Sequence, residues 1–92
     1  MGQKFKETLD YLGPRYYAKI IDCENCICRD LGDYEFEISG LSARGKYKVN
    51  VYVWKDKKQI VRSVYGIHSK EELLKCLETL TQELPYPESQ NT

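Results

Sequence analysis

Residues 46–54 read Lys-Tyr-Lys-Val-Asn-Val-Tyr-Val-Trp, an alternation with period two that predicts a β-strand. One face of this strand would carry Tyr47, Val49, Val51 and Val53. The opposite face would carry Lys46, Lys48, Asn50, Tyr52 and Trp54. The valine face is suited to a hydrophobic core, whereas the second face combines two large aromatic rings with basic and polar groups.

A second strand-like run follows the polar turn at residues 56–58, so residues 46–65 are predicted to form a β-hairpin. With a loop of two or four residues, the valine face would continue through Ile60, Arg62 and Val64. A loop of three residues would instead place Val61, Ser63 and Tyr65 there. We expect the first register. It requires an edge strand, because the Arg62 guanidinium must reach water.

The segment after the hairpin predicts a helix with a marked start and stop. Ser69-Lys-Glu-Glu72 is a capping box, in which the Ser69 hydroxyl accepts from the Glu72 amide while the Glu72 carboxylate reaches back. A buried stripe would follow at Leu73, Leu77, Leu80 and Leu84, with Leu74 and Cys76 beside it. Pro85 ends the helix, and residues 85–92 are expected to be a flexible tail.

The first half of the chain predicts one short helix and three strands. Lys4–Leu12 has helical spacing and is followed by Gly13 and Pro14. Strands are expected over Tyr16–Asp22, Ile27–Leu31 and Tyr34–Ser39, and a polar loop over Gly40–Gly45. Short links favour antiparallel pairing. The predicted fold is a two-layer α+β domain over residues 1–84, of order α-β-β-β-β-β-α, with an antiparallel sheet of four to five strands covered on one face.

Length and charge restrict the class of protein further. Ninety-two residues with a formal net charge of zero suit one domain with one core. Acids concentrate in residues 22–37 and bases in residues 44–62, but overall neutrality argues against a nucleic-acid-coating protein and against an acidic DNA mimic. We find no apolar run long enough for a membrane span and no signal-peptide pattern, so we expect a cytoplasmic protein with reduced cysteines.

The strongest local chemical pattern is Cys23-Glu-Asn-Cys26-Ile-Cys28. A Cys-x-x-Cys pair around a two-residue turn can present both sulfurs to a tetrahedral metal ion, and Cys28 would share a strand face with Cys26. His68 or Cys76 could supply the fourth ligand. Structural zinc sites usually have a second such pair, however, and buried reduced cysteine is common in cores. We therefore expect no metal or other cofactor, and keep Cys23, Cys26, Cys28 and His68 as an alternative.

No residues form a pattern typical of catalysis. His68 is the only histidine, and no orienting group or oxyanion donor can be assigned to it. Glu35 and Glu37 would both lie on the solvent side of a strand, where two carboxylates stay ionised. The glycines are isolated turn residues without a phosphate-binding loop. We therefore predict that the protein is not an enzyme.

The remaining candidate site is the outward face of the hairpin, where we predict a partner-binding surface made by Tyr52, Trp54, Lys46, Lys48, Lys57 and Lys58. Trp and Tyr are favoured at the energetic centres of protein interfaces, so we expect a protein partner or a second copy of the chain. One alternative is a nucleic-acid-binding domain that uses the basic aromatic hairpin 44–62. Another is that Trp54 packs under the first helix or the tail and binds nothing.

The run Cys28-Arg-Asp-Leu-Gly-Asp-Tyr-Glu-Phe-Glu-Ile-Ser-Gly-Leu41, together with the hairpin and the Ser-Lys-Glu-Glu-Leu helix, resembles small proteins of phages and mobile elements. Some of these inhibit host defence, as anti-CRISPR proteins do. The resemblance lies in size and style over residues 4–84 and assigns no functional residue. It implies a compact α+β domain that binds or inhibits by steric contact rather than by catalysis.

Overall fold

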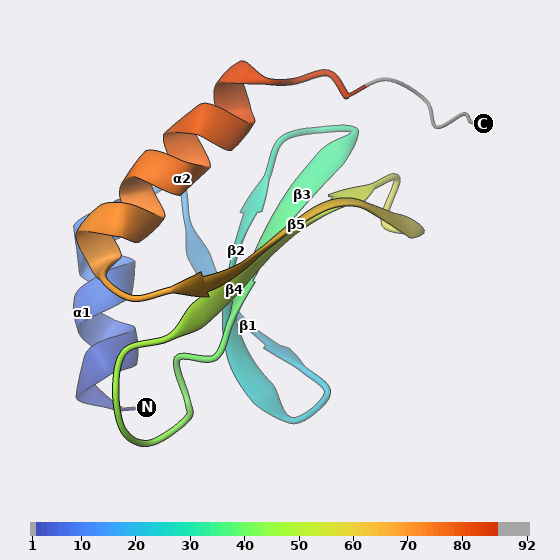
Figure 1. Cartoon of the computed structure of the whole chain (residues 1–92). Helices are drawn as coiled ribbons and strands as arrows, with labels where there is room; N and C mark the ends of the chain where they lie inside the picture. Colours follow the sequence, from blue (N-terminus) through green and yellow to red (C-terminus); the bar gives the residue numbers. More distant parts are fainter. Residues whose placement is uncertain (1, 87–92) are drawn as a thin grey trace.

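One antiparallel sheet and two helices make up the protein, described here by a computed structural model over residues 2–86 (Figure 1). The elements are α1 (Gln3–Leu12), β1 (Tyr17–Ile21), β2 (Glu24–Asp30), β3 (Tyr34–Ser39), β4 (Val49–Lys55), β5 (Gln59–Ile67) and α2 (Lys70–Gln82). The strands lie in the order β1-β2-β3-β4-β5, so each pairs with its neighbour in the chain. The predicted α-β-β-β-β-β-α order and the antiparallel sheet are both confirmed.

Both helices lie against the same face of the sheet (Figure 1). We call this the inner face and the opposite one the outer face. The predicted valine row is correct, because Val49, Val51 and Val53 are fully buried on the inner face. The other buried apolar members of this core are Phe5, Tyr16, Ile27, Tyr34, Phe36, Ile38, Leu41, Ile67, Leu73, Leu77 and Leu80. Within residues 2–86, no helix has the length and apolar character to cross a membrane.

The start of α2 and the end of α1 follow their sequence signals closely, whereas α2 ends at Gln82, before the predicted stop at Pro85, and leaves Leu84 outside the helix. The Ser69 hydroxyl accepts a hydrogen bond from the Glu72 amide at 3.1 Å. The Glu72 carboxylate reaches back to the His68 amide at 2.8 Å, one residue before the cap. At the other helix, Gly13 has φ of +94° and its amide donates to the Leu9 carbonyl. A glycine there closes the helix without the steric cost that a Cβ would add.

The hairpin between β4 and β5 combines the two registers considered from the sequence. Its connection has three residues, with Lys55 opposite Gln59, and Ile60 is paired with Trp54 on the outer face. A register shift follows, so Arg62 is opposite Val53 and Val64 opposite Val51 on the inner face. The prediction is therefore right for Arg62 and Val64 and wrong for Ile60. The cause is a β-bulge, which inserts one extra residue and changes which face the following side chains occupy.

The chain beyond α2 is anchored at Tyr86. Its ring lies edge-on to that of Tyr34, with centroids 5.8 Å apart, and its hydroxyl donates to the Leu80 carbonyl at 3.1 Å. The sequence prediction places the start of a flexible tail at Pro85. This boundary is too early, because Tyr86 packs against the core. Residues 87–92 of that expected tail lie outside the described residues.

Candidate functional site

The outer face of the sheet is the candidate functional surface, because neither helix covers it (Figure 1). Strand register assigns its side chains, since directly paired residues point to the same side. Its members include Tyr17, Lys19, Cys26, Cys28, Glu35, Glu37, Tyr52, Trp54, Ile60, Ser63 and Tyr65. All five strands contribute to it, whereas the sequence prediction drew its aromatic residues from β4 alone.

Trp54 is fixed on this face by a neighbouring strand. Its indole Nε1 donates a hydrogen bond to the Glu37 carboxylate at 2.8 Å, and the ring is half-buried. Trp54 therefore does not pack under α1, one of the alternatives considered from the sequence. It is also not free to rotate, because a carboxylate makes a strong acceptor for the indole N–H.

Tyr52 and Tyr65 form a pair of rings across β4 and β5. Their centroids are 5.9 Å apart and the planes meet at 77°, the edge-to-face arrangement that aromatic rings favour. Tyr52 is half-buried, whereas Tyr65 is 66% exposed. Ile60, beside Trp54, is exposed as well. The accessible apolar groups at this end of the outer face are thus Tyr65 and Ile60, with Tyr52 and Trp54 supporting them.

Polar groups tie the other end of the outer face together. The Tyr17 hydroxyl donates to Glu35 at 3.0 Å, and the Lys19 ammonium lies 3.6 Å from the same carboxylate oxygen. Glu35 is almost fully buried, so these contacts offset the cost of removing its charge from water. Loss of hydration and the hydrogen bond to Glu35 raise the pKa of Tyr17 to about 12. This part of the face is therefore a fixed polar cluster.

Cys26 and Cys28 are fully buried on the outer face, beside that polar cluster. Burial, together with nearby Glu24 and Glu37, raises the pKa of Cys26 to about 12. Burial and Glu35 raise the pKa of Cys28 to about 11. Both thiols therefore stay protonated near neutral pH, which makes them poor nucleophiles.

The alternative metal site is not assembled. The tight turn falls on Asp22 and Cys23, two positions earlier than a turn between Cys23 and Cys26 requires, and both residues have positive φ. Cys23 is exposed at this turn. His68 lies elsewhere, with its Nδ1 3.4 Å from the Tyr47 carbonyl oxygen. No three His, Cys, Asp or Glu side chains within the described chain are grouped as metal ligands would be.

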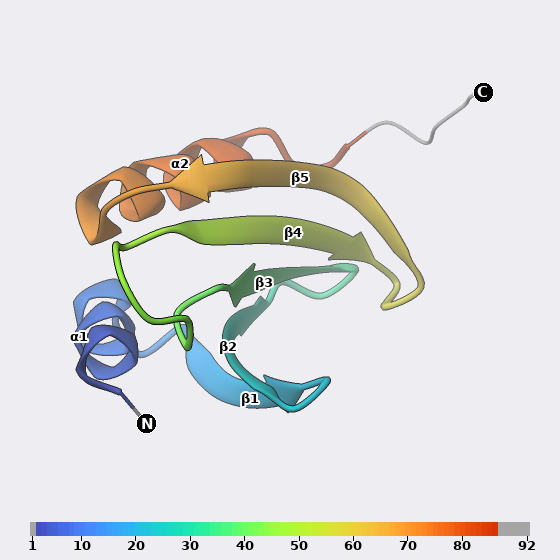
Figure 2. The same cartoon turned by 60° about the horizontal axis from the view of Figure 1, so that its bottom comes forward.

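The predicted lysines do not gather around the aromatic residues. Lys46 and Lys48 lie in the loop before β4, and Lys57 and Lys58 lie in the turn after it (Figure 2). The seven residues of β4 separate these ends by about 20 Å, at roughly 3.3 Å per residue. The acids Glu35 and Glu37 lie opposite Trp54 and Tyr52 instead. The structure therefore keeps Tyr52 and Trp54 together on one surface and divides the four lysines between its two ends.

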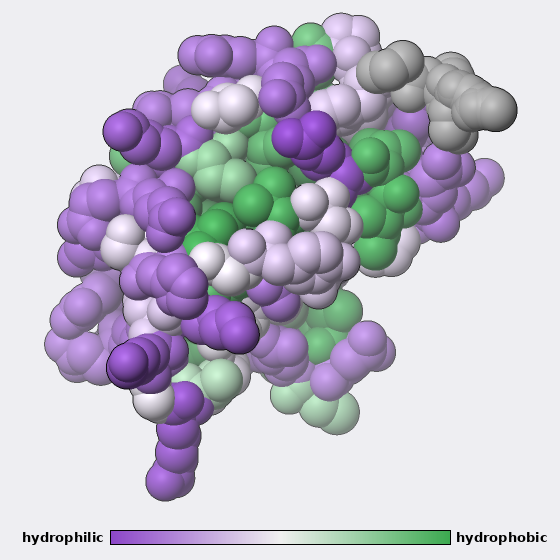
Figure 3. All heavy atoms as spheres, in the orientation of Figure 1, coloured by the Kyte–Doolittle hydropathy of each residue, from purple (hydrophilic) through white to green (hydrophobic). Residues whose placement is uncertain are grey.

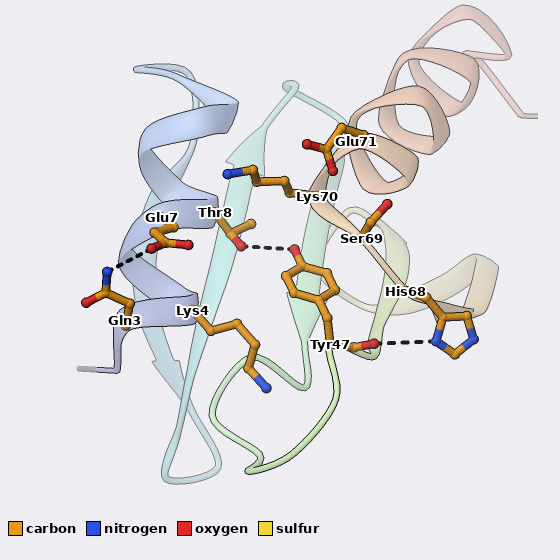
Figure 4. Close-up of a pocket in the computed structure, with 9 residues that line it drawn as sticks. All are labelled: Gln3, Lys4, Glu7, Thr8, Tyr47, His68, Ser69, Lys70 and Glu71. Carbon is orange, nitrogen blue, oxygen red and sulfur yellow. Dashed lines mark hydrogen bonds between the residues drawn. The ribbon is translucent and has the colours of Figure 1, made fainter.

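A hollow lies between α1 and the start of α2 (Figure 4). At its floor the Thr8 and Tyr47 hydroxyls point toward one another and are 2.9 Å apart. Thr8 is fully buried, and this bond satisfies it. The hollow is lined by two lysines and two glutamates, Lys4, Lys70, Glu7 and Glu71, so neither sign of charge dominates. The hydrogen bond between Thr8 and Tyr47 joins α1 to the rest of the domain, and the residues that line the hollow present no grouping suited to catalysis.

Comparisons with known proteins give no family for this chain: no family model, no curated protein and no solved structure matches it.

Proposed function

We propose that this protein is a non-enzymatic binding module that docks a protein partner on the outer face of its sheet. One observation carries the proposal. Five large apolar side chains are exposed within residues 2–86, and three of them, Tyr17, Ile60 and Tyr65, belong to the outer face. Ile60 and Tyr65 lie together at the β5 end of that face, and Tyr17 lies at its β1 end. Exposed aromatic and aliphatic groups on one face are typical of protein interfaces.

Preorganisation supports the same proposal. Trp54 is bonded to Glu37, Tyr65 packs edge-on against Tyr52, and Tyr17 is bonded to Glu35. A partner therefore meets side chains that already have fixed positions, and binding orders few further groups. Action on such a partner is steric, as the resemblance to small inhibitors of host defence implies. No chemical step is required of the surface.

The alternative of a nucleic-acid-binding hairpin has less support. Nucleotide stacking needs cations near the aromatic rings, to hold the phosphates. Here the lysines of the hairpin lie at the two ends of β4, and the carboxylates of Glu35 and Glu37 lie beside Trp54 and Tyr52. We expect a single-stranded oligonucleotide not to bind at physiological salt. Binding that weakens steeply as salt rises would favour the alternative instead.

The proposal is tested by matched surface variants in affinity capture followed by titration of the captured partner. Tyr65→Ala removes the most exposed ring of the outer face, and Tyr11→Ala removes an exposed tyrosine of α1. We expect Tyr65→Ala to weaken binding by about tenfold or more, the effect of one interface residue that contributes strongly. Tyr11→Ala should bind as the wild type does. Equal losses, or a loss for Tyr11→Ala alone, would contradict the proposal.

A further inference from the structure

The two edges of the sheet differ in how they are protected. At the β5 edge, two register shifts interrupt the pairing with β4, Gly66 has φ of +73°, and Arg62 points inward. Bulges and inward charges of this kind prevent an edge strand from pairing with another chain. At the β1 edge, pairing with β2 runs without a shift from Tyr17 opposite Cys28 to Ile21 opposite Glu24. Strand β1 therefore keeps the regular geometry that a further strand needs.

Backbone groups of β1 point outward at known positions. Asp22 and Cys23 both have positive φ, as in a two-residue type I′ turn, so the flanking pair Ile21 and Glu24 exchanges hydrogen bonds. Bonded and non-bonded pairs alternate in an antiparallel ladder. It follows that the N–H and C=O groups of Ala18 and Ile20 project from the free edge.

Side chains at this edge are unusually exposed. The first four residues of β1 are all exposed, and Ile20 is 73% exposed, the highest value among the large apolar residues within 2–86. Figure 3 shows apolar surface over the β1–β2 hairpin, at the lower right. Ile20 lies opposite Asn25 in the register, so it belongs to the inner-face side, where the helices do not reach it.

We propose that β1 pairs antiparallel with β1 of a second copy of this chain, with the two Ala18 residues opposite each other on a two-fold axis. In this register Lys19 of one copy lies opposite Tyr17 of the other, and Ile20 lies opposite Tyr16. Arg15 lies opposite Ile21, next to Asp22 of the second copy. Opposite charges therefore meet at both ends of the paired strands.

Neighbouring registers fit the charges and faces less well. A shift by one residue would place outer-face residues of one copy beside inner-face residues of the other. A shift that keeps the faces but moves the axis to Lys19 would bring two ammonium groups together. The ladder ends at Tyr16, whose N–H already bonds the Gly13 carbonyl, and Pro14 has no N–H to extend it.

The pairing would join two five-stranded sheets into one and make their outer faces continuous. One strand pair of this length buries little surface, so the dimer is weak and depends on concentration. The pairing is independent of the proposed function, because it uses the β1 edge rather than the rings on β4 and β5. A monomeric result would leave the partner-binding proposal intact.

The first test is the solution mass by analytical ultracentrifugation from micromolar to millimolar protein. Ala18→Lys places an ammonium on each side of the two-fold axis at a residue that is exposed in the monomer. Gln59→Lys adds the same charge to the exposed start of β5 and serves as the control. We expect the wild type and Gln59→Lys to dimerise alike, and Ala18→Lys to raise the dissociation constant by about tenfold or more. A wild type that stays monomeric throughout, or Ala18→Lys dimerising like the wild type, would overturn the proposal.

The second test fixes the register by disulfide trapping. In a Cys23→Ser background, which removes the exposed native thiol, Ala18→Cys and Lys19→Cys are oxidised separately with oxidised glutathione. Directly opposed hydrogen-bonded residues have Cα atoms about 5.5 Å apart, within the range that a disulfide spans. We expect the Ala18→Cys dimer to form faster. Faster trapping of Lys19→Cys would overturn the register proposed here.

Discussion

The hydrogen bond between Trp54 and Glu37 gives a prediction that can be worked through quantitatively. The indole Nε1 and the carboxylate Oε1 are 2.8 Å apart across β3 and β4. A hydrogen bond to a charged group contributes about 1.5–3 kcal/mol to stability where it is shielded from water. Both side chains are half-buried, so water competes for the bond. We therefore expect a coupling free energy of about 1 kcal/mol between the two residues.

The measurement is a double-mutant cycle with Trp54→Phe, Glu37→Ala and the double variant. Trp54 is the only tryptophan, so urea unfolding is followed by circular dichroism, which works equally for all four proteins. The double variant should lose about 1 kcal/mol less stability than the sum of the single losses. If the two single losses in stability add up to the loss of the double variant within about 0.3 kcal/mol, Glu37 does not hold the indole of Trp54. The fixed aromatic surface would then lose its main support.

Three further predictions concern the supporting structure. Tyr47→Phe should lower the free energy of unfolding by about 1–2 kcal/mol, because it leaves the fully buried Thr8 hydroxyl without its partner; urea unfolding measures this, and no loss would contradict the contact. Gly40→Ala should lower the free energy of unfolding by about 2–4 kcal/mol, because the new Cβ would lie 2.7 Å from a backbone oxygen. The control is Gly45→Ala, where a Cβ meets no neighbour, so it should cost only the strain of its positive φ. Thermal unfolding compares the two variants, and similar shifts in melting temperature would refute the clash at Gly40. Folding raises the pKa of Cys26 from its ordinary value of 9.0 to about 12, so the free energy of unfolding should fall as the pH rises from about 9 to 12. Cys26→Ala should show a shallower decline over the same pH range. Parallel curves of unfolding free energy against pH for the two proteins would contradict this.

Much of the fold could be predicted because local signals and periodicity agree. The alternation over residues 49–53, the capping box at Ser69 and the glycine after α1 each have one physical interpretation, and the structure confirms each. Side-chain period alone could not predict the bulge in β5, because an extra residue in one strand leaves no mark in the apolar pattern. The result is that Ile60 lies on the outer face.

The candidate surface was only partly predictable, for a related reason. Glu35, Glu37, Tyr52 and Trp54 were each expected to point outward, and the structure places them outward. The expectation that Glu35 is solvated is wrong, because Tyr17 and Lys19 cover its carboxylate and leave it almost fully buried. Their proximity depends on the register between β3 and β4, which the loop between those strands leaves open in the sequence. The lysines are near the aromatic residues in sequence, which predicts that they share the surface, but the seven-residue strand β4 separates the two pairs in space. The buried Thr8 had no signal, because a threonine in a helix is usually solvated.

The most direct test of the central claim uses the single indole N–H signal of Trp54 in two-dimensional NMR spectra. The partner that affinity capture identifies is titrated into an isotopically labelled sample of this protein. If the outer face is the docking surface, the Trp54 signal and the amide signals of Tyr52 and Tyr65 should shift or broaden together, while those of α1 stay in place. An unchanged indole signal at saturation, with shifts confined to the helices, would contradict the account.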